Sequence, residues 1–251
     1  MSGALENEGG AAAFFDLDGT LVPEPSLEKR FFRKLREAGA IPAGNYARWM
    51  SEAARLMWRG IGAVQNENKA YLHGLRPELV CELMETIMFF EEGLRRVEWH
   101  VKQGHAVVLL SGTLQPLAEL AATALEYEIE ARGVECTARV HATRLRTQNG
   151  RWTGRVEGEV LYGEAKRRAM IQIARDAGFD RKRSFAYGDS PQDKAMLGAV
   201  GRAHAVNPGR ELADAANRNN WDIWHWHVEK NMISRGCSRT EREWKERESH
   251  A

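Results

Sequence analysis

Three short, mostly apolar runs constrain the fold of this chain more than any other feature of its sequence. Each run has five or six residues and is followed at once by a polar cluster: residues 11–15, 105–110 and 183–187. Runs of this length are typical of strands buried on both faces of a parallel sheet. Helical periodicity fills the stretches between them. Strands that alternate with helices predict an α/β protein whose mostly parallel sheet is covered by helices on both faces.

The stretch between the first and second runs is long and shows helical patterns only. Leu27, Phe31 and Leu35 recur at helical spacing, and residues 50–58 and 79–89 follow the same rhythm. We therefore expect an all-helical domain inserted after the first strand.

This pattern divides the chain into three parts. Residues 10–24 and 92–228 form the predicted α/β core, residues 25–91 form the helical insertion, and residues 229–251 form a charged tail without an apolar period. Within the core, an Asn149-Gly150 pair between alternating apolar residues predicts a β-hairpin.

The composition limits the partners that the chain can have. Lysine plus arginine number 36 and aspartate plus glutamate 35, so the net charge of +1 predicts no broad surface for nucleic acid. The apolar stretches are too short to span a bilayer, and the first ten residues lack the basic cluster of a targeting signal. Three cysteines without metal-type spacing favour a reducing cytoplasm. We expect a cytoplasmic protein without membrane insertion; peripheral membrane contact and the oligomeric state stay open.

Acidic residues gather at two of the predicted strand ends. Asp16 and Asp18 leave the first strand, and Asp189 and Asp193 follow the strand that ends near residue 187. In open α/β sheets, ligands bind outside the carboxyl ends of the strands. Carboxylate oxygens that arrive there from two distant segments suit a hard cation, so we expect a magnesium site.

The strand ends also provide the groups that phosphate monoester transfer requires. Asp16 can attack phosphorus as a carboxylate nucleophile, and Asp18 can protonate the leaving oxygen and later deprotonate the hydrolytic water. Ser111 and the Gly112 backbone N–H, expected at the start of a helix, can hold phosphate oxygens. Lys166 can offset the negative charges of Asp16 and phosphate. These residues predict a phosphatase that acts on a small phosphorylated metabolite.

At these residues the chain resembles the haloacid dehalogenase superfamily of phosphatases. The four motifs of that superfamily occur in order as Asp16-Leu-Asp-Gly-Thr20, Ser111-Gly112-Thr113, Lys166 and Gly188 to Asp193. The resemblance covers roughly residues 11–228. The helical insertion, and the segment of residues 149–159 before Lys166, are similar to the phosphoserine-phosphatase-like branch, subfamily IB.

The resemblance implies a Rossmann-like, doubly wound core with a C1-type helical cap. It also implies an aspartyl-phosphate intermediate on Asp16 and a Mg²⁺ cofactor. Asp16, the backbone carbonyl of Asp18 and Asp189 would hold the ion, and Asp193 would support the site from nearby. A second role for Asp193, capping the helix that follows it, is equally compatible with its position.

Two positions depart from true phosphoserine phosphatases. Those enzymes usually carry a Glu nine residues after the nucleophile, where this chain has Pro25 with Glu24 beside it. A cap arginine that would bind the substrate carboxylate has only Lys69 as a counterpart. Glu24 and Lys69 are therefore weak candidates for substrate specificity, and serine phosphate is one option among several.

Other interpretations stay open from the sequence. A phosphotransferase or mutase would pass the phosphate to a hydroxyl group, which transfer to added alcohols would reveal, and a non-catalytic binding protein could share the fold. Aromatic and methionine residues of the insertion could line a pocket for a lipid-like substrate, although helix packing explains such residues more often: Trp49, Met50, Met57, Trp58 and Tyr71. His225 and His227 could bind a metal on a predicted strand at residues 223–226, although a packed edge strand explains them more simply.

Overall fold

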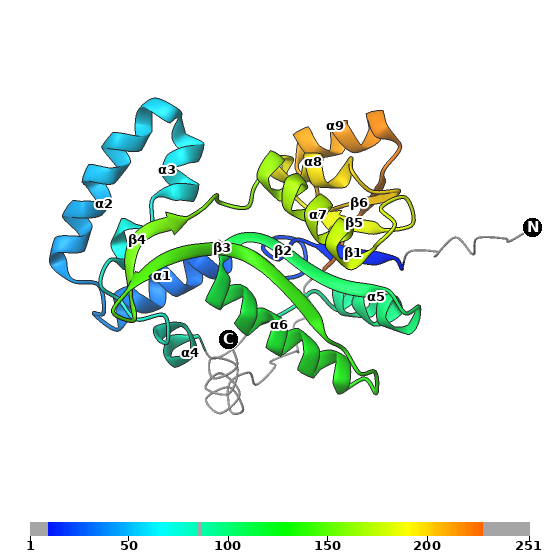
Figure 1. Cartoon of the computed structure of the whole chain (residues 1–251), viewed down its shortest axis with the longest axis horizontal. Coiled ribbons are helices and arrows are strands. Elements are labelled where there is room, and N and C mark those ends of the chain that lie inside the picture. The colour runs from blue at the N-terminus through cyan, green and yellow to red at the C-terminus, as the bar shows by residue number, and fades with distance from the viewer. Residues whose placement is uncertain (1–9, 85–86, 228–251) are drawn as a thin grey trace, which may run out of the picture.

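A seven-stranded sheet forms the centre of the computed structural model, which describes residues 10–84 and 87–227 (Figure 1). The strand order is β4-β3-β2-β1-β5-β6-β7, and every neighbouring pair is parallel except β3 and β4. The predicted mostly parallel sheet is therefore confirmed. The strands are β1 (Ala12–Phe15), β2 (Ala106–Leu114), β3 (Ala138–Gln148), β4 (Arg151–Glu157), β5 (Phe185–Gly188), β6 (Arg202–Val206) and β7 (Asp222–Trp224).

Helices cover both faces of this sheet. The side chains of β1 alternate between the faces: Phe15 packs with residues of α5 and α6, and Phe14 packs with residues of α7, α8 and α9. The core helices are α5 (Glu91–Lys102), α6 (Gln115–Glu130), α7 (Glu164–Ala177), η3 (Pro191–Asp193), α8 (Lys194–Leu197) and α9 (Arg210–Asn219). No helix in the described part of the chain is long and apolar enough to cross a membrane.

The elements described between β1 and α5 are all helices, as predicted. They are α1 (Leu27–Glu37), α2 (Ala43–Leu56), η1 (Met57–Arg59), α3 (Ile61–Glu67), η2 (Ala70–Leu72) and α4 (Leu79–Leu83). Figure 1 shows α2 and α3 side by side, projecting away from the sheet. The helix predicted for residues 79–89 is shorter than expected, because α4 ends at Leu83 and residues 87–90 are not helical.

The helical insertion packs against the β3–β4 hairpin. The Gly74 N–H donates to the Trp152 carbonyl at 2.7 Å, and the Trp152 N–H donates to the Leu75 carbonyl at 2.8 Å. The hairpin turn is the predicted one: Asn149 and Gly150 have φ angles of 52° and 69°, the left-handed values of a type I′ turn. The exact limits of core, cap and tail stay a prediction, and residues 229–251 lie outside the described residues.

The end of β2 differs from the prediction. We expected a strand at residues 105–110 that stops before Ser111, with Ser111 and Gly112 at the start of a helix. In the structure, β2 continues to Leu114 and α6 begins only at Gln115. The cause is pairing with β3, which resumes at Leu114 after a shift of register. Ser111 and Gly112 therefore lie within the strand, and Ser111 is not the helix cap.

His225 and His227 lie beyond the last strand of the sheet. The strand predicted for residues 223–226 is present as β7, which starts one residue earlier and ends two residues earlier, at Trp224. His227 is exposed, and its Nδ1 atom lies 3.3 Å from a carboxylate oxygen of Glu92. Within residues 10–84 and 87–227, neither histidine belongs to a group of side chains that could share an ion.

A stack of aromatic rings crosses the sheet directly behind the polar strand ends. The ring of Tyr187 lies between Phe15 and His204, with centroids 4.4 and 4.7 Å away and ring planes within 9° of parallel. From α5, the Arg96 Nε donates to the Tyr187 hydroxyl at 2.6 Å, and His100 Nε2 lies 2.8 Å from the same hydroxyl. This packing places a rigid layer beneath the residues that follow Phe15 and Tyr187.

The buried histidines of this layer predict a dependence of stability on pH. Burial lowers the pKa of His100 to about 2 and that of His204 to about 4. In the unfolded chain both protonate near pH 6.5, so unfolding takes up protons and its free energy falls as the pH drops below that value. The loss is about 2 kcal/mol per histidine between pH 7 and pH 5.

Urea unfolding of the wild type and of His100→Gln at both pH values isolates this contribution. We expect the variant to lose about 2 kcal/mol less than the wild type over this interval, because one proton-binding group is gone. His105 contacts His100 at 2.9 Å, and the titrating groups outside this contact contribute equally to both proteins. The same loss in both proteins would contradict a neutral, buried His100.

Candidate active site

One buried lysine joins two acidic residues that are far apart in the chain. Lys166, in the first turn of α7, is 3% exposed, and its Nζ atom donates to Asp16 Oδ1 and to Asp193 Oδ1, each at 2.6 Å. Asp16 follows β1 directly, and Asp193 ends the short helix η3 after β5. The structure thus brings together three of the four predicted motifs at one edge of the sheet.

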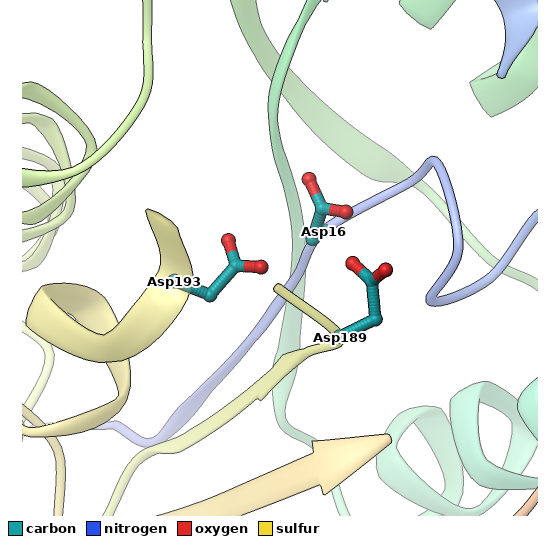
Figure 2. Close-up of side chains that lie close together, drawn as sticks. All are labelled: Asp16, Asp189 and Asp193. Atoms are coloured by element: carbon teal, nitrogen blue, oxygen red, sulfur yellow. The ribbon is translucent and has the colours of Figure 1, made fainter. Parts of the chain in front are cut away.

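Asp189 completes this cluster of carboxylates. One oxygen from each of Asp16, Asp189 and Asp193 lies within 4.8 Å of the others, and Figure 2 shows the three side chains converging from separate segments. The Thr20 hydroxyl lies 3.4 Å from oxygens of both Asp16 and Asp189. Asp16 and Asp189 are therefore close enough to share a cation, as the sequence predicted.

Glycine is required beside this cluster. Gly19 has a φ angle of 88°, and a Cβ atom at this position would lie 2.2 Å from Asp189 Oδ2. At Gly188, a Cβ atom would lie 2.5 Å from the Cβ atom of Asp193. Both motif glycines thus provide clearance for an acidic side chain, and at Gly19 the backbone conformation also favours glycine.

Burial makes the charges of these carboxylates costly. It raises the pKa of Asp16, against the effect of the Lys166 ammonium, and the charge of Asp193 adds to the rise. Burial also raises the pKa of Asp189, and the charges of Asp16 and Asp193 raise it further. A divalent cation would relieve this repulsion, and carboxylate oxygens are the ligands that Mg²⁺ prefers. The residues present therefore fit a magnesium ion.

Asp193 is bound at both of its oxygens. Its Oδ1 atom accepts from Lys166, while its Oδ2 atom accepts from the Ser190 N–H at 3.1 Å and from the Ser190 hydroxyl at 2.7 Å. The Ser190–Asp193 pair forms a capping box at the start of η3. Asp193 therefore belongs to the capping box of η3 and positions Lys166, but its side chain does not cap α8, the helix that follows it and that we expected it to cap. Its support of the metal site stays a prediction.

Asp18 lies apart from the three clustered carboxylates. Its Oδ1 atom accepts from the Leu27 N–H at 2.7 Å, at the start of α1. Burial raises the pKa of Asp18 to about 6, with smaller contributions from the charges of Glu28 and Glu24. A carboxyl group that titrates this close to neutral pH can both donate and accept a proton. Metal binding by the Asp18 backbone carbonyl stays a prediction.

Ser111 and Gly112 lie in the part of β2 that extends beyond its pairing with β1. Phe15 pairs with Leu109, so Ser111 stands two residues beyond that pair. The Ser111 Oγ atom accepts from the Thr113 N–H at 3.3 Å, and the Gly112 carbonyl accepts from the Thr143 hydroxyl at 2.8 Å. Their role in phosphate binding stays a prediction, and it does not involve the helix start that we expected.

The structure pairs the weak specificity candidate Lys69 with an acidic residue of α1. Lys69 is 3% exposed, and its Nζ atom lies 2.5 and 2.7 Å from the two carboxylate oxygens of Glu28. Tyr71 donates to the same carboxylate at 2.9 Å. Lys69 therefore forms an ion pair with Glu28. The sequence analysis missed Glu28, because its only local signal is an acidic residue in the first turn of a helix. Glu24 is exposed, accepts from the Ser26 N–H and pairs with Lys29.

Substitution of this buried pair tests its strength. We expect Glu28→Gln to lower the free energy of unfolding by about 3 kcal/mol, because it leaves the Lys69 ammonium buried without a carboxylate. Lys69→Met should cost less, since Glu28 is 21% exposed and water can reach it. The double variant should be more stable than the sum of the two losses predicts.

Urea unfolding of the four proteins measures this coupling. The exposed pair of Lys29 and Glu24 is the matched control, and its removal should change stability by less than about 1 kcal/mol. Additive losses at Lys69 and Glu28 would show that the two side chains do not interact.

The sequence model of the haloacid dehalogenase-like hydrolase family matches residues 13–198 of this chain. The chain belongs to this family. The inhibition of morphological differentiation protein of Streptomyces azureus is 32% identical over 237 residues, which cover 86% of this chain and 78% of that protein. Phosphoserine phosphatase SerB1 of Mycobacterium tuberculosis is 30% identical over 232 residues, which cover 87% of this chain and 71% of that protein.

Solved structures share the fold of this family member. A protein of unknown function from Bordetella pertussis superimposes with a TM-score of 0.60 at 23% identity and covers 86% of this chain and 98% of its own. A phosphoserine phosphatase in a phospho-aspartyl intermediate analogue form has a TM-score of 0.58 at 22% identity and covers 86% and 93%. The predicted fold class, a doubly wound α/β core with a cap, is confirmed. The predicted enzyme class, a phosphoric monoester hydrolase of this superfamily, agrees with the family match and these relatives.

Proposed function

We propose that this chain is a magnesium-dependent phosphatase that hydrolyses a small organic phosphate monoester through an aspartyl-phosphate on Asp16. The contact of Asp16 with Lys166 at 2.6 Å, beside Asp189 at the sheet edge, is the observation that carries this proposal. The Lys166 ammonium holds the Oδ1 atom of Asp16 in place. The other oxygen, Oδ2, accepts a hydrogen bond from the Thr20 hydroxyl at 3.4 Å, and it is the one that attacks phosphorus.

Asp16 and Asp18 divide the chemistry between them. As the bond from Asp16 to phosphorus forms, the bond from phosphorus to the ester oxygen breaks, and the Asp18 carboxyl gives its proton to the departing alkoxide. Asp18, now a carboxylate, then takes a proton from the water that attacks the acyl phosphate. Inorganic phosphate leaves, and Asp16 returns as a carboxylate. The raised pKa of Asp18, about 6, suits both proton transfers.

The remaining site residues bind and neutralise the phosphate. Ser111 and the Gly112 N–H hold its oxygens at the end of β2, and Lys166 balances its charge together with that of Asp16. Asp16, the Asp18 carbonyl and Asp189 would hold Mg²⁺, which when bound would supply positive charge to offset the negative phosphoryl oxygens. Asp193 keeps Lys166 oriented through its contact with the ammonium group at 2.6 Å.

The substrate is a small phosphorylated metabolite of the cytoplasm. Relatives of this chain are named phosphoserine phosphatases, which keeps serine phosphate among the options. Two features favour a different alcohol: Pro25 occupies the place of the glutamate expected for a substrate amine, and Lys69 is paired with Glu28 instead of being available for a carboxylate. A screen of amino acid, sugar, amino alcohol and glycerolipid phosphates would identify the substrate.

Replacement of the nucleophile tests the mechanism. Asp16→Asn should abolish release of inorganic phosphate from an aryl phosphate, because an amide cannot form the acyl phosphate. Circular dichroism should show that the variant keeps the fold. Asp214→Asn, which removes an exposed aspartate on α9, is the matched control and should retain full turnover. Undiminished turnover by Asp16→Asn would refute the assigned nucleophile.

The predicted metal requirement has a separate test. Chelation should remove activity and added Mg²⁺ should restore it. Asp189→Asn should raise the magnesium concentration needed for half-maximal phosphate release at least about tenfold, because one carboxylate ligand loses its charge. A magnesium titration of both proteins measures this shift. Equal half-saturating concentrations would remove Asp189 from the ligand set.

A further inference from the structure

Exposed apolar side chains are concentrated on one part of the helical insertion. Of the seven large hydrophobic residues that are exposed in the described part of the chain, five lie between positions 46 and 61. Trp58 is 81% exposed, and Met50 and Ile61 are each 67% exposed. The five residues are Tyr46, Met50, Met57, Trp58 and Ile61. Clustered exposure of this kind marks an interaction surface, whereas single exposed residues do not.

The packing of α2 does not require this exposed surface. Tyr46, Met50 and Ala54 recur every four residues and form a stripe on the exposed side of the helix. A different side of α2 is turned inward, where Asn45 and Leu56 are buried. The helix therefore has one side that stabilises the fold and a second apolar side that faces solvent.

The apolar stripe leads to the tip of the α2–α3 pair. Met57 and Trp58 lie in η1, and Ile61 begins α3. Figure 1 shows this end of the pair projecting away from the sheet. No atom lies within 4 Å of the Cβ positions built at Gly60 and Gly62, so the turn is open on its outside. We call this exposed surface, Tyr46 to Ile61, the cap tip.

The cap tip is also basic, in contrast to the nearly neutral chain. Residues 46–61 contain Arg48, Arg55 and Arg59, all exposed, and one acidic residue, Glu52. Arg55 pairs with Glu52 at 2.5 Å, and Arg59 pairs with Glu67 of α3 at 2.6 Å. Both pairs are bidentate. Arg48 is in no ion pair within the described part of the chain, so its charge is the one most readily available to an anionic partner.

We propose that the cap tip is a contact surface for anionic phospholipid membranes, whose interface Met57, Trp58 and Ile61 enter. Tryptophan and aliphatic side chains beside arginines are the residues that bind lipid headgroup regions. A second copy of the chain would bring the same arginines face to face. The proposal does not depend on the phosphatase assignment.

Vesicle sedimentation of the full chain tests this proposal. We expect binding to vesicles of equal parts phosphatidylglycerol and phosphatidylcholine, little binding to phosphatidylcholine alone, and loss of binding with increasing salt. The variant Met57→Ser/Trp58→Ser/Ile61→Ser should reduce the binding at least about tenfold. Tyr127→Ser, which removes an exposed aromatic residue of α6, is the matched control and should bind as the wild type does.

Three results would overturn the proposal. The first is absence of wild-type binding to the anionic vesicles, and the second is equal binding by the triple variant when circular dichroism shows that it is folded. The third is a concentration-dependent dimer in sedimentation velocity that the triple variant abolishes, without vesicle binding, since this result would assign the cap tip to a second copy.

Arg48→Gln/Arg55→Gln should weaken binding only to the anionic vesicles, and equal weakening on both vesicle types would contradict the role of charge.

Discussion

The ion pairs of one buried lysine hold the candidate active site together. The Nζ atom of Lys166 lies 2.6 Å from oxygens of both Asp16 and Asp193, and all three side chains are almost completely buried. Buried charges are tolerated only when they are paired and hydrogen-bonded. The end of β1, the turn after β5 and the start of α7 must therefore meet at one point, so the same contacts stabilise the core and assemble the site.

The core around this point provides rigidity and clearance. The rings of Phe15, Tyr187 and His204 are stacked. Phe15 and Tyr187 lie one or two residues before the acidic residues that follow β1 and β5, and His204 lies on the neighbouring strand β6. This stack limits the movement of the acidic residues. Gly19 and Gly188 make room for the carboxylates themselves. Catalysis by positioned charges requires both properties, since a preorganised site need not rearrange during the reaction.

The helical insertion contacts the candidate active site at Asp18. Its tip also has an exposed apolar surface. The N–H of Leu27 binds Asp18, and the next residue, Glu28, binds Lys69 and Tyr71 more than 40 residues further along the chain. The interior of the insertion is thus connected to the proposed acid. Its outer tip combines exposed apolar and basic residues around Trp58, which is the chemistry of an interface and not of a core.

Local sequence patterns determined the strands β1 and β5, because short apolar runs are typical of strands that are buried on both faces of a sheet. Since parallel strands end at the same sheet edge, those patterns were also enough to bring Asp16 near Asp189. Only the tertiary structure decided that Ser111 continues β2, because pairing with β3 extends the strand beyond its apolar run. Only the fold could also show that Lys69 is bound by Glu28, 41 residues away. Periodicity describes the face on which a side chain lies, whereas the partner of a buried charge depends on how distant segments pack.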